Sequence, residues 1–111
     1  MTKGSGPRDF RFQERAVDRL RTIRNYFFLT QEEVAEAIGE KKARISGLEL
    51  GKYECRIKEF ANMLIFFNSI AIERGVEPYD INELLFSEEF VLHEQQSDKQ
   101  NTEMLDKAKG R

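Results

Sequence analysis

The segment LTQEEVAEAIGEKKARISGLELGK, from Leu29 to Lys52, decides the fold of this chain. Thr30 is followed three residues later by Glu33, which is a capping box: the hydroxyl accepts from the Glu33 amide, and the Glu33 side chain bonds the Thr30 amide. A helix is therefore expected to begin after Thr30. Its shared apolar face would consist of Val34, Ala35 and Ile38. Gly39 follows, and glycine adopts the left-handed conformation that ends a helix at little cost.

A second short helix is expected after that glycine, from about Lys41 to Leu50. Ile45 and Leu48 would face the core, because residues three apart share one side of a helix. Gly51 would end this helix in the same way as the first. The segment thus predicts two short helices joined by a turn of about three residues.

Two such helices and a turn make up the helix-turn-helix arrangement. The small residue Ala35 falls where the helices cross closely, Gly39 falls in the turn, and Ile45 falls where the second helix enters the core. On these residues the segment resembles the phage repressor and Cro type of helix-turn-helix domain, the Xre-like family of bacterial regulators. The resemblance extends from about residue 20 to residue 86. It implies an all-α, compact five-helix bundle of the lambda-repressor-like type.

The resemblance also implies roles for residues at matching positions. Lys42, Ala43 and Gly47 match recognition-helix positions that face base edges in the major groove, and Arg44 lies beside them. Lysine can donate to guanine acceptors, and a small apolar side chain can touch a thymine methyl group. We therefore expect base contacts from Lys42, Ala43, Arg44 and Gly47.

Phosphate contacts are expected around the same helix. Gln31 matches the family glutamine whose side chain bonds a phosphate and supports the recognition helix, and its amide lies at the positive end of a helix dipole. The full set of expected phosphate-contacting residues is Gln31, Lys41, Lys52, Tyr53 and Arg56. Arg24 and Glu49 match an internal ion pair that ties the first helix to the end of the third. That pair would be structural.

Gly47 departs from the family pattern, because this position often carries a reading side chain. Glycine inside a helix costs about 0.5–1 kcal/mol relative to alanine. Two interpretations stay open: Gly47 either relieves packing or lets the backbone approach DNA closely.

The first and fourth helices are predicted from apolar residues at three- and four-residue steps. The first would be capped by Asp9 and bury Ala16, Val17, Leu20, Ile23 and Phe27. Arg11, Arg15 and Arg19 would lie on another face, where they either pair with Glu14 and Asp18 or contact phosphate.

The fourth helix, from about Ile57 to Arg74, would bury one stripe of apolar residues: Ile57, Phe60, Ala61, Leu64, Phe67 and Ile70 or Ala71. Met63, Ile65, Phe66 and Ile72 widen the stripe beyond the usual arc. The extra width is either core or, with the Phe90 segment, a surface buried by a second subunit. Asp80 would cap a fifth helix whose apolar side consists of Ile81, Leu84, Leu85 and Phe86.

The domain limits follow from composition. Residues 1–8 are expected to form a flexible arm, residues 9–92 the domain, and residues 93–111 a disordered polar tail in which His93 is solvated. No secretory signal or membrane span is expected, which predicts a cytoplasmic protein. Cys55 is the only cysteine and is expected to be an inert thiol. We expect neither a metal nor a cofactor.

Charge is distributed unevenly along the chain, although the net charge is −2. Residues 1–58 contain thirteen Lys and Arg against nine Asp and Glu, which gives +4, whereas residues 59–111 contain five against eleven, which gives −6. Such asymmetry is typical of a surface that binds a polyanion on one side.

The sequence therefore predicts a sequence-specific regulator of transcription, acting as a repressor, that binds double-stranded DNA as a homodimer. The alternative is an antitoxin-type module that acts mainly through a protein partner, with the tail from Ser87 onward folding on that partner. An enzyme is not expected, because the sequence offers no nucleophile with a base, no glycine-rich phosphate loop and no paired carboxylates.

Overall fold

The computed structural model describes the backbone of residues 5–95 and the side chains of residues 14–95. Within this range the chain forms five helices. They are α1 (Ser5–Tyr26), α2 (Gln31–Ile38), α3 (Lys42–Glu49), α4 (Ile57–Glu73) and α5 (Ile81–Leu85). The same residues contain no strand, only an isolated antiparallel bridge between Val76 and Gln95. The predicted all-α class with five helices is confirmed for this part of the chain.

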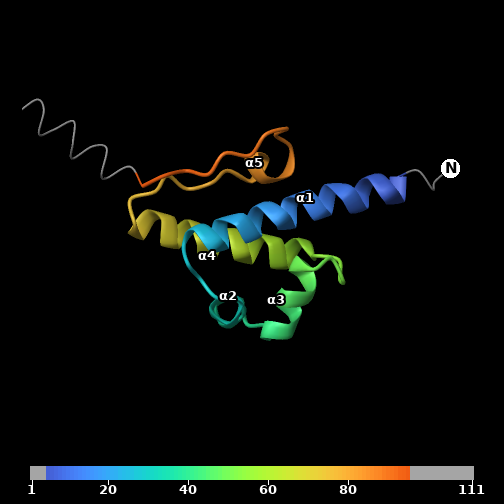
Figure 1. Cartoon of the computed structure of the whole chain (residues 1–111), viewed down its shortest axis with the longest axis horizontal. Coiled ribbons are helices and arrows are strands. Elements are labelled where there is room, and N and C mark those ends of the chain that lie inside the picture. The colour runs from blue at the N-terminus through green and yellow to red at the C-terminus, as the bar shows by residue number, and fades with distance from the viewer. Residues whose placement is uncertain (1–4, 96–111) are drawn as a thin grey trace, which may run out of the picture.

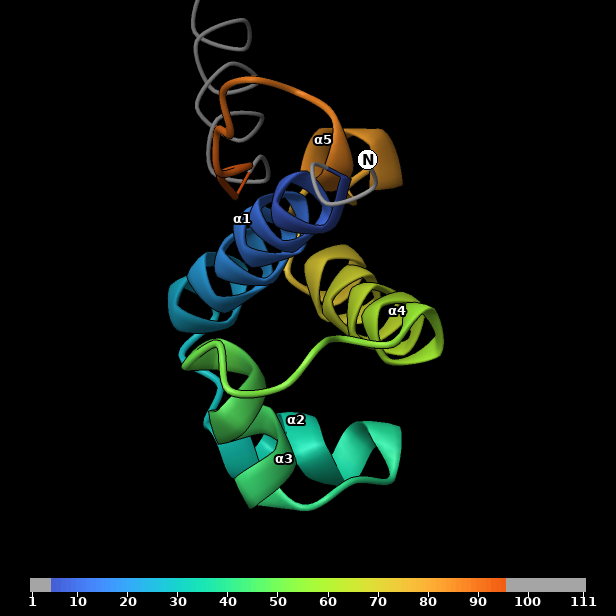
Figure 2. The same cartoon turned by 90° about the vertical axis from the view of Figure 1, so that its right-hand side faces the viewer.

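The helices lie in three tiers (Figures 1 and 2). α1 and α4 form the middle tier, with α2 and α3 on one side and α5 with the segment that follows it on the other. α1 contacts α3, α4 and α5, and α2 contacts α3 and α4. The first and fourth helices are thus the scaffold on which the pair α2 and α3 is mounted.

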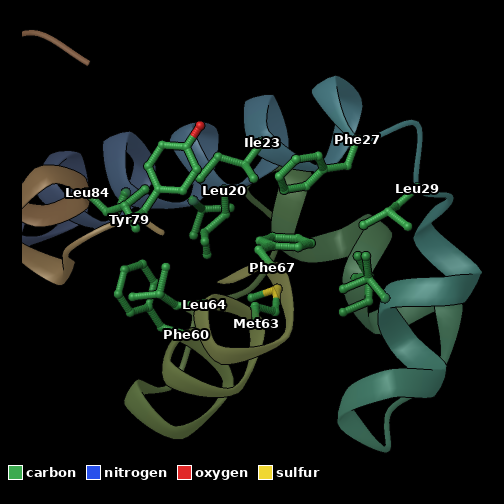
Figure 3. Close-up of a cluster of buried hydrophobic side chains, with 14 of the residues drawn as sticks. Leu20, Ile23, Phe27, Leu29, Phe60, Met63, Leu64, Phe67, Tyr79 and Leu84 are labelled. Carbon is green, nitrogen blue, oxygen red and sulfur yellow. The ribbon is translucent and has the colours of Figure 1, made fainter. Parts of the chain in front are cut away.

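The core lies within the middle tier, between α1 and α4, and between that tier and its two neighbours (Figure 3). Phe27, Ile23 and Phe67 are almost completely buried, and they bring α1 and α4 into contact. All five apolar residues predicted for the first helix are buried: Ala16, Val17, Leu20, Ile23 and Phe27. Because a buried aromatic ring removes a large apolar area from water, these residues supply much of the driving force for folding.

α1 begins earlier than the sequence suggested. It starts at Ser5, so Asp9 lies inside the helix and the expected arm of residues 1–8 contributes four residues to it. Pro7 is compatible with this start, because backbone amides of a first helical turn have no intrahelical acceptor. Residues 1–4 and the side chain of Arg11 lie outside the described part.

Arg19 is not part of an exposed cationic stripe, which corrects the sequence-based expectation. Its side chain is buried, and it donates to the carbonyl oxygens of Glu83 at 2.8 Å and Glu88 at 3.3 Å. The guanidinium also lies 5.6 Å from the centre of the Phe90 ring. Arg19 therefore holds α5 and the following segment onto α1. Arg15, by contrast, is exposed.

Of the predicted buried stripe of α4, four residues are buried and two are partly buried: Phe60, Leu64, Phe67 and Ala71 are buried, and Ala61 and Ile70 are partly buried. Met63, one of the residues that widen the stripe, also lies in the core. Ile57, by contrast, is 85% exposed, which corrects its place in the predicted stripe, although Glu59 and Phe60 in the same turn are buried. Ile65 and Ile72, each 67% exposed, also lie outside the core, whereas Phe66 is partly buried against it. Burial of this flank by a second subunit stays a prediction.

The fold extends past the predicted limit at residue 92. The His93 ring stacks on Tyr79 with centroids 4.1 Å apart, and its ring nitrogens contact the Glu77 carbonyl and the Glu83 carboxylate at 2.7 and 3.1 Å. The expectation of a solvated His93 is therefore wrong. The rest of the predicted tail, residues 96–111, lies outside the described residues. Within the described part, no helix has the length and apolar character needed to cross a bilayer.

Candidate nucleic-acid interface

The start and end of α2 follow the predicted local chemistry. The Glu33 amide donates to the Thr30 hydroxyl at 3.0 Å, and the Thr30 amide donates to the Glu33 carboxylate at 2.8 Å. Gly39 ends the helix in the left-handed region with φ of 75°, and the Glu40 amide donates to the Ala35 carbonyl at 2.8 Å. The predicted capping box and glycine stop are confirmed, so the turn that leads into α3 is well defined.

α3 is anchored by the two predicted apolar residues. Ile45 and Leu48 are 1% and 3% exposed, and they lie against α1 and α2. Successive helical residues are rotated by about 100°, so Ala43 and Leu50 point away from this buried side. Ala43 is exposed, and Leu50, at the end of the helix, is 67% exposed. The helix thus has one face in the core and an opposite face in solvent.

The C-terminal end of α3 is held by a network of charged and polar side chains. Arg24 donates to the Glu49 carboxylate from Nε at 2.7 Å and from Nη2 at 2.9 Å, and it also donates to the Leu29 carbonyl. Gln31 donates from Nε2 to Glu49 at 2.8 Å. The predicted Arg24–Glu49 ion pair is confirmed. Gln31 supports α3 as expected, and its contact with phosphate stays a prediction.

Arg44, predicted to contact bases, instead binds inside the protein. Its Nε and Nη2 donate to the Glu59 carboxylate at 2.7 and 2.8 Å, and Nη2 also donates to the Glu54 carbonyl at 3.0 Å. The hydrogen bonds from Arg44 hold the pKa of Glu59 below its ordinary value, and the same contact raises the pKa of Arg44. This guanidinium is satisfied within the fold, so Arg44 is withdrawn from the base-contacting residues.

Gly47 is withdrawn from the base-contacting residues as well, because it is buried under the Tyr53 ring. A Cβ atom at Gly47 would lie far inside van der Waals contact of the ring atoms Cδ2 and Cε2. Of the two interpretations open for this glycine, packing is therefore the correct one. Tyr53 itself is 50% exposed, and the Arg44 guanidinium lies 5.2 Å from its ring centre.

Exposed cations lie at the start of α3 and in the loop that follows it. Lys41 immediately precedes the helix in extended conformation, Lys42 is its first residue, and both side chains are exposed. Lys52 is exposed in the following loop, where its amide donates to the Gly47 carbonyl at 2.8 Å. Arg56 is exposed too, and its side chain lies 3.8 Å from Glu59. After Arg44 and Gly47 are removed, the predicted site retains Lys42 and Ala43 for base contacts and Gln31, Lys41, Lys52, Tyr53 and Arg56 for phosphate contacts.

The sequence analysis did not identify two residues next to the candidate interface. Lys58, in the first turn of α4, is a further exposed cation. Glu59 is buried, and it accepts a hydrogen bond from the Arg56 amide at 2.9 Å in addition to those from Arg44. A glutamate at the third position of a helix is a capping signal. The signal was weak here because arginine, and not Ser, Thr, Asp or Asn, precedes the helix.

Cys55 lies next to this group and is buried. Burial raises the pKa of its thiol to about 11. A thiol at neutral pH is a poor nucleophile, which agrees with the expected inert residue. Among the described residues no group of three or more His, Cys, Asp and Glu is arranged to hold a metal ion.

Comparison of the chain with protein-family models, curated proteins and solved structures found no match.

Proposed function

We propose that this protein is a sequence-specific regulator of transcription that binds double-stranded DNA and acts as a repressor. α2 and α3 would be a helix-turn-helix unit of the phage repressor and Cro type, with α3 in the major groove. The observation that carries the proposal is the free face of α3. It offers Lys42 and Ala43, it is bordered by exposed cations, and it is held on its other side by Ile45 and Leu48.

The proposed contacts fall into two classes. Lys42 and Ala43 read base edges, because an ammonium can donate to guanine and a methyl group can touch thymine. Phosphates are bound by Lys41, Lys52 and Arg56. The backbone amide of Gln31, at the start of α2, also binds a phosphate. Phosphate contacts fix the position of the protein on the duplex, and base contacts select the sequence.

The arrangement of charge supports one orientation. α5 and residues 86–95 lie on the opposite side of the molecule from α2 and α3 (Figure 2). The acidic residues of α5 and residues 86–95 are Glu83, Glu88, Glu89 and Glu94, and Glu77 and Asp80 lie just before α5. Repulsion between them and the phosphates would disfavour an approach of DNA from that side.

Two copies would bind one operator. A single α3 offers few base contacts, each good one being worth about 1–3 kcal/mol. A homodimer would read two half-sites about 34–36 Å apart, so the operator would be an imperfect palindrome.

The alternative, a module that acts mainly through a protein partner, finds no specific support in the described residues. The segment expected to fold on such a partner runs from Ser87 onward. Its residues 87–95 pack on the protein itself through Arg19 and Tyr79, and the rest of it lies outside the described residues.

The proposal predicts that the protein enriches a motif from a library of random duplexes at physiological salt. Lys42→Ala should change the preferred bases within that motif, because it removes a base contact. Lys52→Ala should weaken binding to all sequences and reduce the dependence of log K on log salt by about one unit, because it removes a phosphate contact. Sequencing of the bound pools and binding isotherms at several salt concentrations measure both effects.

Arg15→Ala is the matched control. Arg15 is an exposed cation next to Arg19, on the side of α1 that carries α5. Its removal should leave motif and salt dependence unchanged. A wild-type protein that enriches no motif would refute the proposal, and so would a Lys42→Ala pool identical to the wild-type pool.

A further inference from the structure

The Tyr53 ring occupies the place of the side chain that Gly47 lacks. Gly47 lies one turn after Ala43, and residues four apart are neighbours on the surface of a helix. The ring covers Gly47 so closely that a Cβ atom there could not be accommodated without moving it. The solvent face of α3 therefore continues from Ala43 onto an aromatic ring that comes from the following loop.

The ring is held in this place by its neighbours. The Arg44 guanidinium lies 5.2 Å from the ring centre, and Arg44 is itself fixed by two hydrogen bonds to the buried Glu59 carboxylate. The backbone of the adjacent Lys52 is bonded to Gly47 at 2.8 Å. A side chain that is fixed before binding loses little conformational entropy on binding. Half of the Tyr53 surface is still exposed to solvent.

The chemistry of this surface is apolar. Ala43 contributes one methyl group, Gly47 contributes no side chain, and the ring contributes an aromatic face. In the major groove, apolar side chains recognise the 5-methyl group of thymine. We infer that Tyr53 is a specificity-determining residue whose ring, seated on Gly47, contacts a thymine methyl group; this inference rests on the proposed function.

This role differs from the one expected from sequence, in which Tyr53 runs along the backbone and contacts phosphate. The two roles depend on different parts of the side chain. A phosphate contact needs the phenol hydroxyl as donor, whereas a methyl contact needs only the ring. Phenylalanine therefore separates them.

The test begins with the motif enriched by the wild-type protein. Each thymine of a bound duplex is replaced in turn by deoxyuridine, which lacks only the 5-methyl group, and affinities are measured for wild type and variants. At one position in each half-site, the replacement should lower the affinity of the wild type about fourfold, the value expected for one buried methyl group. Tyr53→Phe should show the same loss, because it keeps the ring.

Two variants should be insensitive to that replacement. Tyr53→Ala removes the ring, and Gly47→Ala displaces it while Tyr53 is still present. Thermal unfolding identifies any variant that has lost its fold. The two variants change different residues, so if both are insensitive to deoxyuridine, the displaced Tyr53 ring is the cause that they share.

The inference is overturned if the wild type enriches a motif but Tyr53→Ala still distinguishes thymine from deoxyuridine at every position. It is also overturned if Tyr53→Phe weakens binding as much as Tyr53→Ala, which would assign the contact to the hydroxyl. In both cases the proposed function stands. A wild type that enriches no motif overturns the function and the inference together.

Discussion

At the scale of single residues, the pair of Arg44 and Glu59 decides how α3 can act. Arg44 has the charge expected of a DNA-reading side chain, but its guanidinium bonds the Glu59 carboxylate through two nitrogens at 2.7 and 2.8 Å. A buried charge that loses its partner is strongly destabilising. Arg44 is therefore better described as the support for Tyr53 and for the start of α4 than as a reader of bases.

The first prediction at this scale concerns pH. The pKa of Glu59 is lowered from its ordinary value of 4.5, chiefly by the hydrogen bond from Arg44. Its contribution to stability is therefore fully present above pH 4.5 and is lost as the pH falls through the folded-state pKa. Glu59→Gln should lower the free energy of unfolding by about 3 kcal/mol at neutral pH. The difference from wild type should shrink in acid.

Urea denaturation at several pH values measures this difference. Glu54→Gln serves as the control, because Glu54 is exposed and binds Arg44 only through its backbone carbonyl. A Glu59→Gln effect that is independent of pH, or no larger than that of Glu54→Gln, would contradict the assignment.

At the scale of elements, α3 is a short helix that owes its position to its surroundings. It has eight residues, and an isolated helix of that length is not stable in water. Ile45 and Leu48 fix its inner face, Arg24 and Gln31 hold its end through Glu49, and Glu59 holds Arg44. Elements that are far apart in the sequence thus combine to keep one helix rigid.

Glu49→Ala tests this arrangement. The variant leaves Arg24, whose side chain is largely buried, without its carboxylate partner. The free energy of unfolding should therefore fall by about 3 kcal/mol. Chemical denaturation of the variant and of Glu36→Ala, which removes an exposed carboxylate from α2, gives the comparison. Equal stabilities for the two variants would show that the network does not position α3.

Features encoded within a few residues could be predicted from the sequence, and features that depend on distant partners could not. Thr30 with Glu33 and Gly39 are local signals, and the helix they define is found with its predicted limits. The partner of Arg44 is fifteen residues away, and that of Arg19 is sixty-four residues away. No periodic pattern in the sequence links residues so far apart, so the sequence analysis placed both arginines on the surface. The apolar face of α4 is wide, and periodicity alone placed Ile57 in the buried stripe although it is 85% exposed.

At the scale of the whole molecule, the tier of α1 and α4 separates the acidic side chains of α5 and residues 86–95 from the exposed cations next to α3. α2, on the same side as α3, carries the exposed Glu32, Glu33 and Glu36, so the cations are confined to α3 and the loop that follows it. The acidic region of α5 and residues 86–95 is a fixed part of the fold, because Arg19, Phe90, Tyr79 and His93 bind it to α1 and to the start of α5. Its charge therefore stays on the side away from α3 (Figure 1). This arrangement predicts that a polyanion binds next to α3 and the loop after it, and not at α5 or residues 86–95.

Mapping of backbone amide chemical shifts during titration with a duplex that carries the selected motif tests this claim most directly. We predict that the largest changes fall on Gln31, on residues 41–47 and on residues 52–56, and that α5 and residues 86–95 are unaffected. Changes centred on α5 or on the exposed flank of α4, with residues 41–47 unaffected, would contradict the central claim that α3 is the DNA-reading element.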